Sequence, residues 1–289
     1  MAERACWFAS DLHGREERYE KLFALVAGAP PAALFLGGDL LPSGSLLFGN
    51  SRAGQGDFLE EFLVPALRRL RRGLGPAYPR LFLILGNDDP RRQEAAFLER
   101  AREGLWEYVH NRRAMLGEFA VYGYACVPPT PFALKDWERY DVSRFVDPGS
   151  LAPEEGRYSI EVADNEKGLP FIQEELQALA GDGPLERAIF LFHSPPYQTA
   201  LDRAALDGRT FEGVPLDVHV GSIAVRRFIE ERQPRITLHG HVHESARLSG
   251  AWRQAIGRTH CFSAAHDGPE LALVCFDAAD PSQAERRLL

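Results

Sequence analysis

Five short apolar runs punctuate the chain, and between them apolar residues recur every three or four positions. The runs span residues 5–9, 32–36, 81–85, 188–192 and 235–238. Runs of this length that end at turn residues predict buried strands, whereas the longer stretches with a period near 3.6 residues predict helices. This alternation predicts an α/β or α+β protein.

The first helical pattern is the most regular. Tyr19, Leu22, Phe23 and Val26 share one face of a helix. Three further stretches have similar spacing. Phe58, Phe62 and Leu70 predict a helix with a kink at Pro65, and Ile172, Leu176 and Leu179 predict one after the favourable first-turn residue Pro170. Ala224, Phe228 and Ile229 predict a helix with Ser222 as its N-cap, which Pro234 ends.

The remaining segments are less regular. Residues 104–124 predict consecutive strands with turns near Asn111 and Gly117, and residues 245–262 and 271–276 predict a closing antiparallel meander. Segments 42–56 and 127–164 show no clear periodicity, and we expect irregular loop or lid segments there. Neither segment has the composition of a long linker, so we expect residues 1–289 to form a single domain.

Composition narrows the classes of protein. The 289 residues carry 41 acidic and 33 basic side chains, a formal net charge of −8, which argues against a protein that coats nucleic acid. No run approaches the ~18 apolar residues of a membrane helix, and the first residues do not resemble a signal peptide. The four cysteines are scattered without a C-x-x-C pair, which is typical of reduced thiols. We therefore expect a cytoplasmic protein that does not contact a membrane.

Metal-binding residue types follow every one of the five predicted strands. In chain order they are Asp11 and His13, then Asp39, then Asn87, then His193, and finally His241 with His243. Each motif alone is weak, because Gly-Asp and Gly-Asn are common in turns and a lone histidine is more often a core residue. Because ligands in α/β sheets collect outside the carboxyl ends of strands, we expect these side chains to lie together.

The donor set predicts a dinuclear metal centre. Seven oxygen and nitrogen donors without a thiolate exceed the three or four ligands of a single zinc site. They suit two divalent ions, with Mn²⁺ favoured and Fe, Zn²⁺, Co²⁺ or Ni²⁺ as alternatives. Asp39 is a natural bridging ligand, since one carboxylate can hold two ions ~3.5–4 Å apart.

The ordered motifs resemble those of the calcineurin-like metallophosphoesterases. That family carries D-x-H, G-D-x-x-D or a relative, G-N-H-D/E, a single His, and G-H-x-H, and the resemblance covers residues 5 to about 265. Within the superfamily, the chain resembles the predicted phosphoesterases related to the Icc protein. The supporting stretches are 123–124 leading to 128–132, His219-Val220-Gly221-Ser222, and residues 240–245.

The resemblance implies a fold, a ligand set and a reaction. The fold is an α/β/β/α four-layer arrangement of two mixed β-sheets packed as a sandwich and flanked by helices. The ligands implied for one ion are Asp11, His13, Asp39 and His243, and those for the other are Asp39, Asn87, His193 and His241. The implied reaction is hydrolysis of a phosphodiester or phosphomonoester by attack of a hydroxide that bridges the two ions.

Two positions depart from the family pattern. Pro42 stands where the second acid of G-D-x-x-D is expected, which costs little because that acid is peripheral. Asp88 stands in place of the histidine of G-N-H-D/E. In the family, the role implied for that histidine is to contact the substrate phosphate or to protonate the leaving group. The neighbouring Asp89 would influence the pKa of Asp88. An ionised Asp88 repels a phosphate dianion more than a diester monoanion, so we expect a preference for phosphodiesters. The alternative is that Asp88 orients a metal-bound histidine.

Other residues have two interpretations each. His219 is a candidate catalytic residue that contacts substrate, or it is a solvent-facing residue of a helix-capping turn. Trp137, Tyr140 and Phe145 form either a lid that stacks a nucleobase or, as we expect, part of the core. His110, His239, His260 and His266 are expected to be structural or surface residues.

The partners expected are correspondingly limited. The sequence predicts a small phosphoester substrate, possibly nucleotide-derived, and no extended nucleic-acid surface. It leaves the oligomeric state, the native metals and the physiological substrate open. Alternative functions are a non-catalytic metal-binding scaffold of the same fold and a nuclease of the same superfamily. The full set of predicted ligands weighs against the scaffold, and the acidic single domain weighs against the nuclease.

Overall fold

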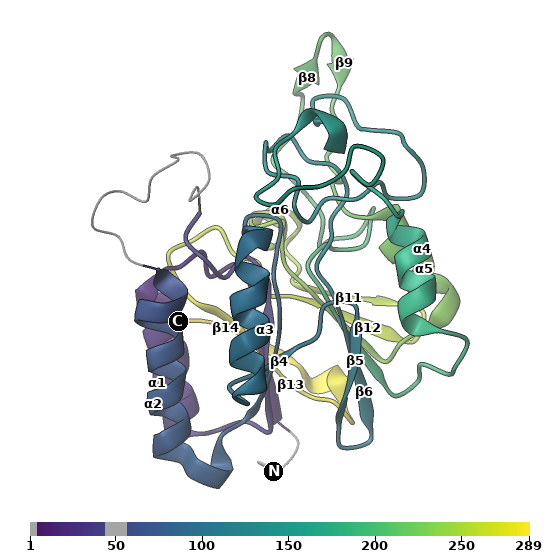
Figure 1. The fold of residues 1–289 in the computed structure, drawn as a ribbon. Coiled ribbons are helices and arrows are strands. Elements are labelled where there is room, and N and C mark those ends of the chain that lie inside the picture. Colours follow the sequence, from purple (N-terminus) through teal and green to yellow (C-terminus); the bar gives the residue numbers. More distant parts are fainter. Residues whose placement is uncertain (1–4, 44–56) are drawn as a thin grey trace.

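Two six-stranded mixed sheets form the framework of the computed structural model, which describes residues 5–43 and 57–289. The order in the first sheet is β14 (Glu285–Leu288), β13 (Ala272–Asp277), β1 (Ala5–Ala9), β2 (Ala33–Gly37), β3 (Arg80–Ile84) and β4 (Glu107–Tyr108). The order in the second is β11 (Arg253–Ile256), β12 (Thr259–Ser263), β10 (Ile236–His239), β7 (Ala188–Phe192), β6 (Phe119–Tyr124) and β5 (Arg112–Leu116). A small hairpin of β8 (Thr210–Phe211) and β9 (Val214–Pro215) lies apart from both sheets (Figure 1).

Helices cover the outer side of each sheet, which gives four layers (Figure 1). Beside the first sheet lie α1 (Glu16–Gly28), α2 (Val64–Leu74), which continues the π-helical turn Leu59–Leu63, and α3 (Glu94–Arg102). Beside the second lie α4 (Ile172–Ala180) and α5 (Ile223–Arg232), whereas the short helix α6 (Ser245–Ser249) directly follows the turn after β10. This arrangement confirms the predicted two-sheet sandwich.

The central strands explain the long apolar runs in the sequence. β2 and β7 are buried at every residue, because each lies inside its sheet with the other sheet on one face and a helix layer on the other. Strands buried on both faces show continuous apolar runs rather than alternation. Both strands have parallel neighbours: β2 pairs with β1 and β3, and β7 pairs with β6 and β10.

Most of the predicted elements are confirmed within a residue or two. All four apolar residues of the first helical face are buried on α1, and the Ser222 side chain caps α5 by accepting a hydrogen bond from the Val225 amide. The kink expected at Pro65 coincides with the change from the π-helical turn to α2. Residues 127–164 contain no helix or strand beyond one short 3-10 turn at Pro153–Glu155.

Three expectations differ from the structure or lie outside the described residues, and two elements were not predicted. The closing meander was wrong in two respects. Residues 245–249 form α6, because one helical turn is too short to show a period. β11 and β12 pair antiparallel in the second sheet, whereas β13 pairs with β1 in the first. The strands of 104–124 do not simply run antiparallel, since β4 pairs in parallel with β3. α3 and β14 were not predicted. Most of the expected loop 42–56 lies outside the described residues, of which only Pro42 and Ser43 belong to it.

Within residues 5–43 and 57–289, no helix combines the length and the apolar character that a membrane span requires.

Candidate metal centre

The turns that follow β1, β2 and β10 bring four predicted ligands together. Donor atoms of Asp11, His13, Asp39 and His243 all lie within 4.8 Å of one another. Backbone hydrogen bonds fix the first two turns side by side, with the Asp11 amide donating to Gly38 O at 3.0 Å and the His13 amide to Asp39 O at 2.8 Å. These four residues are the set that the resemblance implies for one metal ion.

A second group shares Asp39 and adds residues from three other strand ends. His193 Nε2 lies 3.4 Å from Asp39 Oδ2 and 3.0 Å from Asn87 Oδ1. The rings of His193 and His241 lie with their centroids 5.3 Å apart. The structure therefore brings all seven predicted ligands to one edge of the sandwich, where the carboxyl ends of the parallel strands of both sheets meet.

The backbone at this edge is held in an uncommon conformation. Eight non-glycine residues of the described chain have positive φ, and four of them, Asp11, His13, Asp39 and His241, are predicted ligands. Such conformations cost of order 1–3 kcal/mol each and persist only where the surroundings enforce them. Their concentration at one place is typical of a functional site.

Two glycines allow the ligand-bearing turns to approach closely. A Cβ atom at Gly86 would lie 2.3 Å from Asp39 Oδ1 and 2.7 Å from His193 Cε1. A Cβ atom at Gly240 would lie 2.6 Å from Asp11 Oδ2. Both distances are too short for any side chain, so these positions require glycine for the carboxylates to reach the centre.

The electrostatics of the centre favour positive charge. Burial alone would raise the pKa of Asp11 and Asp39, yet the neighbouring histidines hold the pKa of Asp11 far below its usual range and lower that of Asp39 to about 2. Burial would lower the pKa of His13 and His193, but the nearby carboxylates raise both to about 9. Without a cation, the carboxylates are thus compensated by protons on the histidines.

These residues fit a metal ion, because three of their donor atoms lack a suitable hydrogen-bond partner. Asp11 Oδ2 is buried and has no hydrogen-bond partner, which is costly for a carboxylate. His13 Nε2 and His243 Nε2 point at each other at 3.1 Å, an arrangement in which at most one proton can lie between the two nitrogens. A divalent cation among these atoms satisfies all three, and oxygen and nitrogen donors suit Mn²⁺, Fe, Co²⁺ or Zn²⁺.

His193 is already oriented for such a role. Its Nδ1 lies 2.8 Å from the Gly37 carbonyl oxygen, which can only accept, so Nδ1 carries the hydrogen. The neutral form therefore has its lone pair on Nε2, the nitrogen that faces Asp39 and Asn87. Metal-binding histidines commonly donate their second nitrogen to a carbonyl or carboxylate in this way.

Asp88 turns toward a predicted ligand. Its Oδ2 lies 3.3 Å from His13 Nδ1, its amide donates to Asp39 Oδ1 at 2.8 Å, and its side chain is 33% exposed. His13 Nδ1 also lies 2.8 Å from the Ser43 hydroxyl. This geometry favours the interpretation that Asp88 orients His13.

Sequence reasoning missed the supporting role of two residues. Asp89 is fully buried and accepts hydrogen bonds from the amides of Leu40, Leu41 and Gly86, so it joins the turns after β2 and β3. Burial and the Asp39 carboxylate raise the pKa of Asp89 to about 7. Arg18 donates to the carbonyls of Asp11 and Gly268 and is buried beside the apolar face of α1. The sequence signal that could have indicated this role of Arg18 is its position beside the apolar face of the helix.

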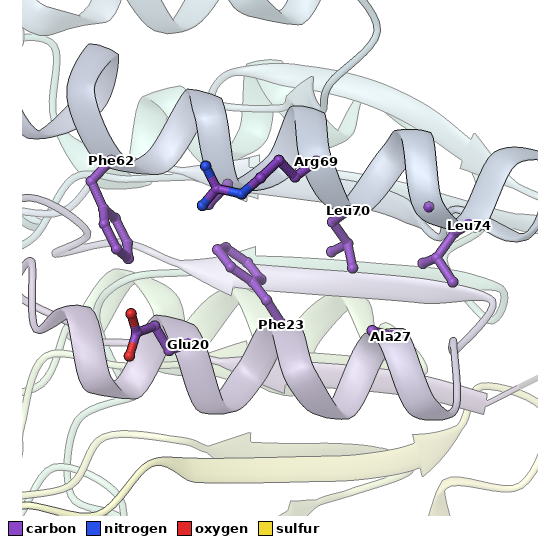
Figure 2. A pocket seen from close by; sticks show the side chains of 9 residues that line it. Glu20, Phe23, Ala27, Phe62, Arg69, Leu70 and Leu74 are labelled. Carbon is purple, nitrogen blue, oxygen red and sulfur yellow. The ribbon is translucent and has the colours of Figure 1, made fainter.

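The other candidate residues do not belong to the group of seven predicted ligands. His219 contacts Asp202 and is 28% exposed at its side chain. Trp137 and Tyr140 belong to the core, as expected, but Phe145 is 69% exposed, so the expectation that it is a core residue was wrong. A groove of about 450 Å³ lies between α1 and α2, lined by residues such as Phe23, Phe62 and Leu70 (Figure 2). None of its lining residues is a predicted ligand.

Comparisons with known proteins show the family and the fold of the chain. Residues 6–245 match the family described as calcineurin-like phosphoesterases. No curated protein matches the chain.

Solved structures of low sequence identity are similar in fold. One crystal structure with 17% identity has a TM-score of 0.61 and covers 99% of this chain and 98% of its own. A protein of Thermus thermophilus has 19% identity and a TM-score of 0.54 over 99% and 98% of the two chains. A dimetal phosphatase from Danio rerio has 11% identity and a TM-score of 0.55 over 96% and 93%. At these identities the similarity shows the fold alone.

Proposed function

The chain belongs to the calcineurin-like phosphoesterases, and from that premise we propose that it is a dinuclear metal-dependent phosphoesterase that favours phosphodiesters. The observation that carries this proposal is the convergence of Asp11, His13, Asp39 and His243 within 4.8 Å around a buried carboxylate oxygen that lacks a partner. The proposed substrate is a small phosphoester, possibly derived from a nucleotide.

The proposal assigns two ligand groups that share one carboxylate. Asp11, His13, Asp39 and His243 would hold one ion, and Asp39, Asn87, His193 and His241 the other. When bound, two divalent ions supply Lewis-acid charge and lower the pKa of a water molecule that serves as nucleophile. We propose Mn²⁺ as the ion, because all seven donors are oxygen or nitrogen.

The chain's own residues prepare the site for this chemistry. His193 is fixed in one tautomer by Gly37, and Asp88 holds His13 in its orientation. Asp89 and Arg18 fix the backbone of the turns from which the ligands project. Preorganisation of this kind lowers the reorganisation required during the reaction.

The preference for diesters follows from the position of Asp88. Its partly exposed carboxylate lies beside the ligands, where it opposes the second negative charge of a monoester dianion more than the single charge of a diester. In family members with a histidine at this position that repulsion is absent.

Metal content and turnover test the proposal together. The purified protein is expected to hold two divalent ions per chain and to hydrolyse bis-p-nitrophenyl phosphate faster than p-nitrophenyl phosphate in Mn²⁺. Tight metal binding with no turnover of any phosphoester would instead support a non-catalytic scaffold. Faster turnover of the monoester would overturn the preference but leave the reaction class intact.

A further inference from the structure

Asp202 and His219 form a carboxylate–imidazole pair in the segment between β7 and α5. Asp202 is fully buried and accepts hydrogen bonds from the amides of Gln198, Thr199 and Gly221 at 2.8–3.2 Å. His219 Nδ1 lies 2.8 Å from Asp202 Oδ1. Because a carboxylate only accepts, Nδ1 carries the hydrogen, and Nε2 is the nitrogen available to another molecule.

The surroundings of His219 fix its backbone but leave that nitrogen free. The His219 amide donates to Asp217 Oδ1 at 2.9 Å, and the Tyr197 hydroxyl donates to Asp217 Oδ2 at 2.6 Å. The side chain is 28% exposed, and within residues 5–43 and 57–289 no hydrogen-bond partner reaches Nε2. A helix-capping role does not require this arrangement, since Ser222 and Asp141 accept the hydrogen bonds of the first amides of α5.

Two hydrogen bonds connect the segment that carries the pair to turns that bear predicted ligands, one between two backbone groups and one from a backbone amide to a side chain. Ser222 N donates at 2.9 Å to the carbonyl of Pro195, which is two residues beyond the predicted ligand His193, and Ser222 is three residues beyond His219. Ala205 N donates at 3.0 Å to Glu244, the residue after the predicted ligand His243. These hydrogen bonds and the Arg203–His219 bridge join the segment of the pair to the turns that follow β7 and β10.

We propose that His219 contacts the leaving-group oxygen of the substrate and donates a proton to it from Nε2, with Asp202 as the positioning residue. This proposal rests on the proposed phosphoesterase function. As the ester P–O bond breaks, its electron pair stays on the oxygen, which takes the proton and leaves as an alcohol. Attack of water forms the new P–O bond, and the proton that this water releases restores His219.

The geometry explains why this histidine, and not the residue after Asn87, takes that role. In this chain Asp88 faces His13 and cannot serve both purposes. An imidazole whose Nδ1 hydrogen is held by a buried carboxylate keeps one orientation and one tautomer. Leaving-group protonation of this kind contributes about 10²–10⁴-fold to a rate.

A pair of diesters that differ in leaving group tests the proposal. Phenolate is a stronger base than p-nitrophenolate and depends more on protonation. His219→Gln is expected to lower kcat/KM for diphenyl phosphate by at least about 100-fold, and for bis-p-nitrophenyl phosphate by less than about tenfold. Asp202→Asn is expected to shift the two substrates in the same unequal way. His260→Gln is the matched control, because His260 lies at the opposite end of the strands, paired with Ile236.

Each other result counts against the proposal. Equal losses on both substrates would show a structural role, and no loss on either would show no role. A second readout is independent of turnover: phenyl phosphate should shift the imidazole ¹⁵N resonances of His219 and leave those of His260 unchanged, and the absence of that shift would overturn the proposal. If the unaltered protein, loaded with two ions, hydrolyses neither diester, the proposed function itself fails along with this inference. Normal metal content in His219→Gln separates the two cases.

Discussion

His13 Nδ1 and Asp88 Oδ2 lie 3.3 Å apart, so a carboxylate occupies the side of a predicted metal ligand that faces away from the ligand cluster. Asp88 is, with Pro42, one of the two positions that depart from the family pattern, and it is the one in contact with a predicted ligand.

Removing the charge of Asp88 is expected to change both rate and selectivity. Asp88→Asn keeps the shape but loses the ionic contact with His13, and partners of metal-bound histidines are typically worth about 10–100-fold in affinity or activity. We expect kcat/KM for bis-p-nitrophenyl phosphate to fall within that range and its ratio to p-nitrophenyl phosphate turnover to fall as well. The surface change Asp164→Asn should leave both unchanged. An unaltered ratio in Asp88→Asn would remove the basis for the diester preference.

Metal stoichiometry is expected to distinguish shared from unshared ligands. Asp39 contributes to both proposed groups, whereas His243 contributes to one. Asp39→Asn should therefore lose both ions and lower kcat by at least about 10³-fold, since metal ions and their bound water carry the chemistry. His243→Asn should retain about one ion per chain. Elemental analysis after gel filtration measures this, and one ion retained in Asp39→Asn would contradict the sharing.

Removal of metal is expected to destabilise the protein. Ions that bind only the folded state stabilise it by about 2.7 kcal/mol per site at one hundred times the dissociation constant. In their absence the buried carboxylates rely on protonated histidines and the strained turns are less constrained. The Tm in excess EDTA should be several degrees below that in Mn²⁺. Asp39→Asn provides the control, because its Tm should not respond to EDTA.

A buried ion pair outside the group of predicted ligands is expected to affect the stability of the protein and not its activity. Lys135 Nζ lies 2.6 Å from Glu138 Oε2, and both side chains are fully buried. Glu138→Gln leaves an unpaired buried charge and should cost about 3–5 kcal/mol of unfolding free energy, measured in urea. The exposed pair of Arg144 and Glu154 is the comparison, for which Glu154→Gln should cost less than about 1 kcal/mol. Similar costs for both would show that burial of the Lys135 pair is unimportant.

Stability is expected to fall at mildly acidic pH partly through His110. Burial, followed by the charges of Arg139, Arg91 and Arg112, lowers the pKa of His110 to about 3, and its Nδ1 accepts a hydrogen bond from the Ala125 amide. The unfolded chain binds this proton below about pH 6.5 and the folded chain does not, so stability is lost as pH decreases from 6.5 toward 3.

His110→Asn tests this assignment. Asparagine preserves an acceptor and cannot titrate, so the slope of unfolding free energy against pH should decrease by at most about 1.4 kcal/mol per pH unit over this range. Parallel curves for the variant and the unaltered protein would assign the acid sensitivity to other groups.

The polar residues that follow the apolar runs predicted the candidate site, whereas the runs themselves predicted only strands. Asp11, Asp39 and His193 were recognisable as candidates because parallel strands carry their following turns to one edge of their sheet, and a buried parallel strand has a distinctive continuous apolar pattern. The sandwich came from the family resemblance, since periodicity alone does not specify how two sheets face each other.

The contacts missed by sequence reasoning share a physical cause. Asp202 meets His219 through a bridge inside an irregular segment, and Arg18 meets Gly268 across almost the whole chain. Neither contact depends on local propensity, so no local pattern indicates it. Phe145 was assigned to the core on residue type, whereas its 69% exposure is decided by the path of an irregular loop.

The division of the predicted ligands between the sheets has a consequence for assembly. Asp11, His13, Asp39 and Asn87 project from strands of the first sheet, whereas His193, His241 and His243 project from the second. Neither half of the chain contains a complete donor set for either ion. For the ligand groups that we propose, tight metal uptake is therefore expected only after the two sheets have docked. During refolding, metal uptake would report the moment at which the sandwich closes.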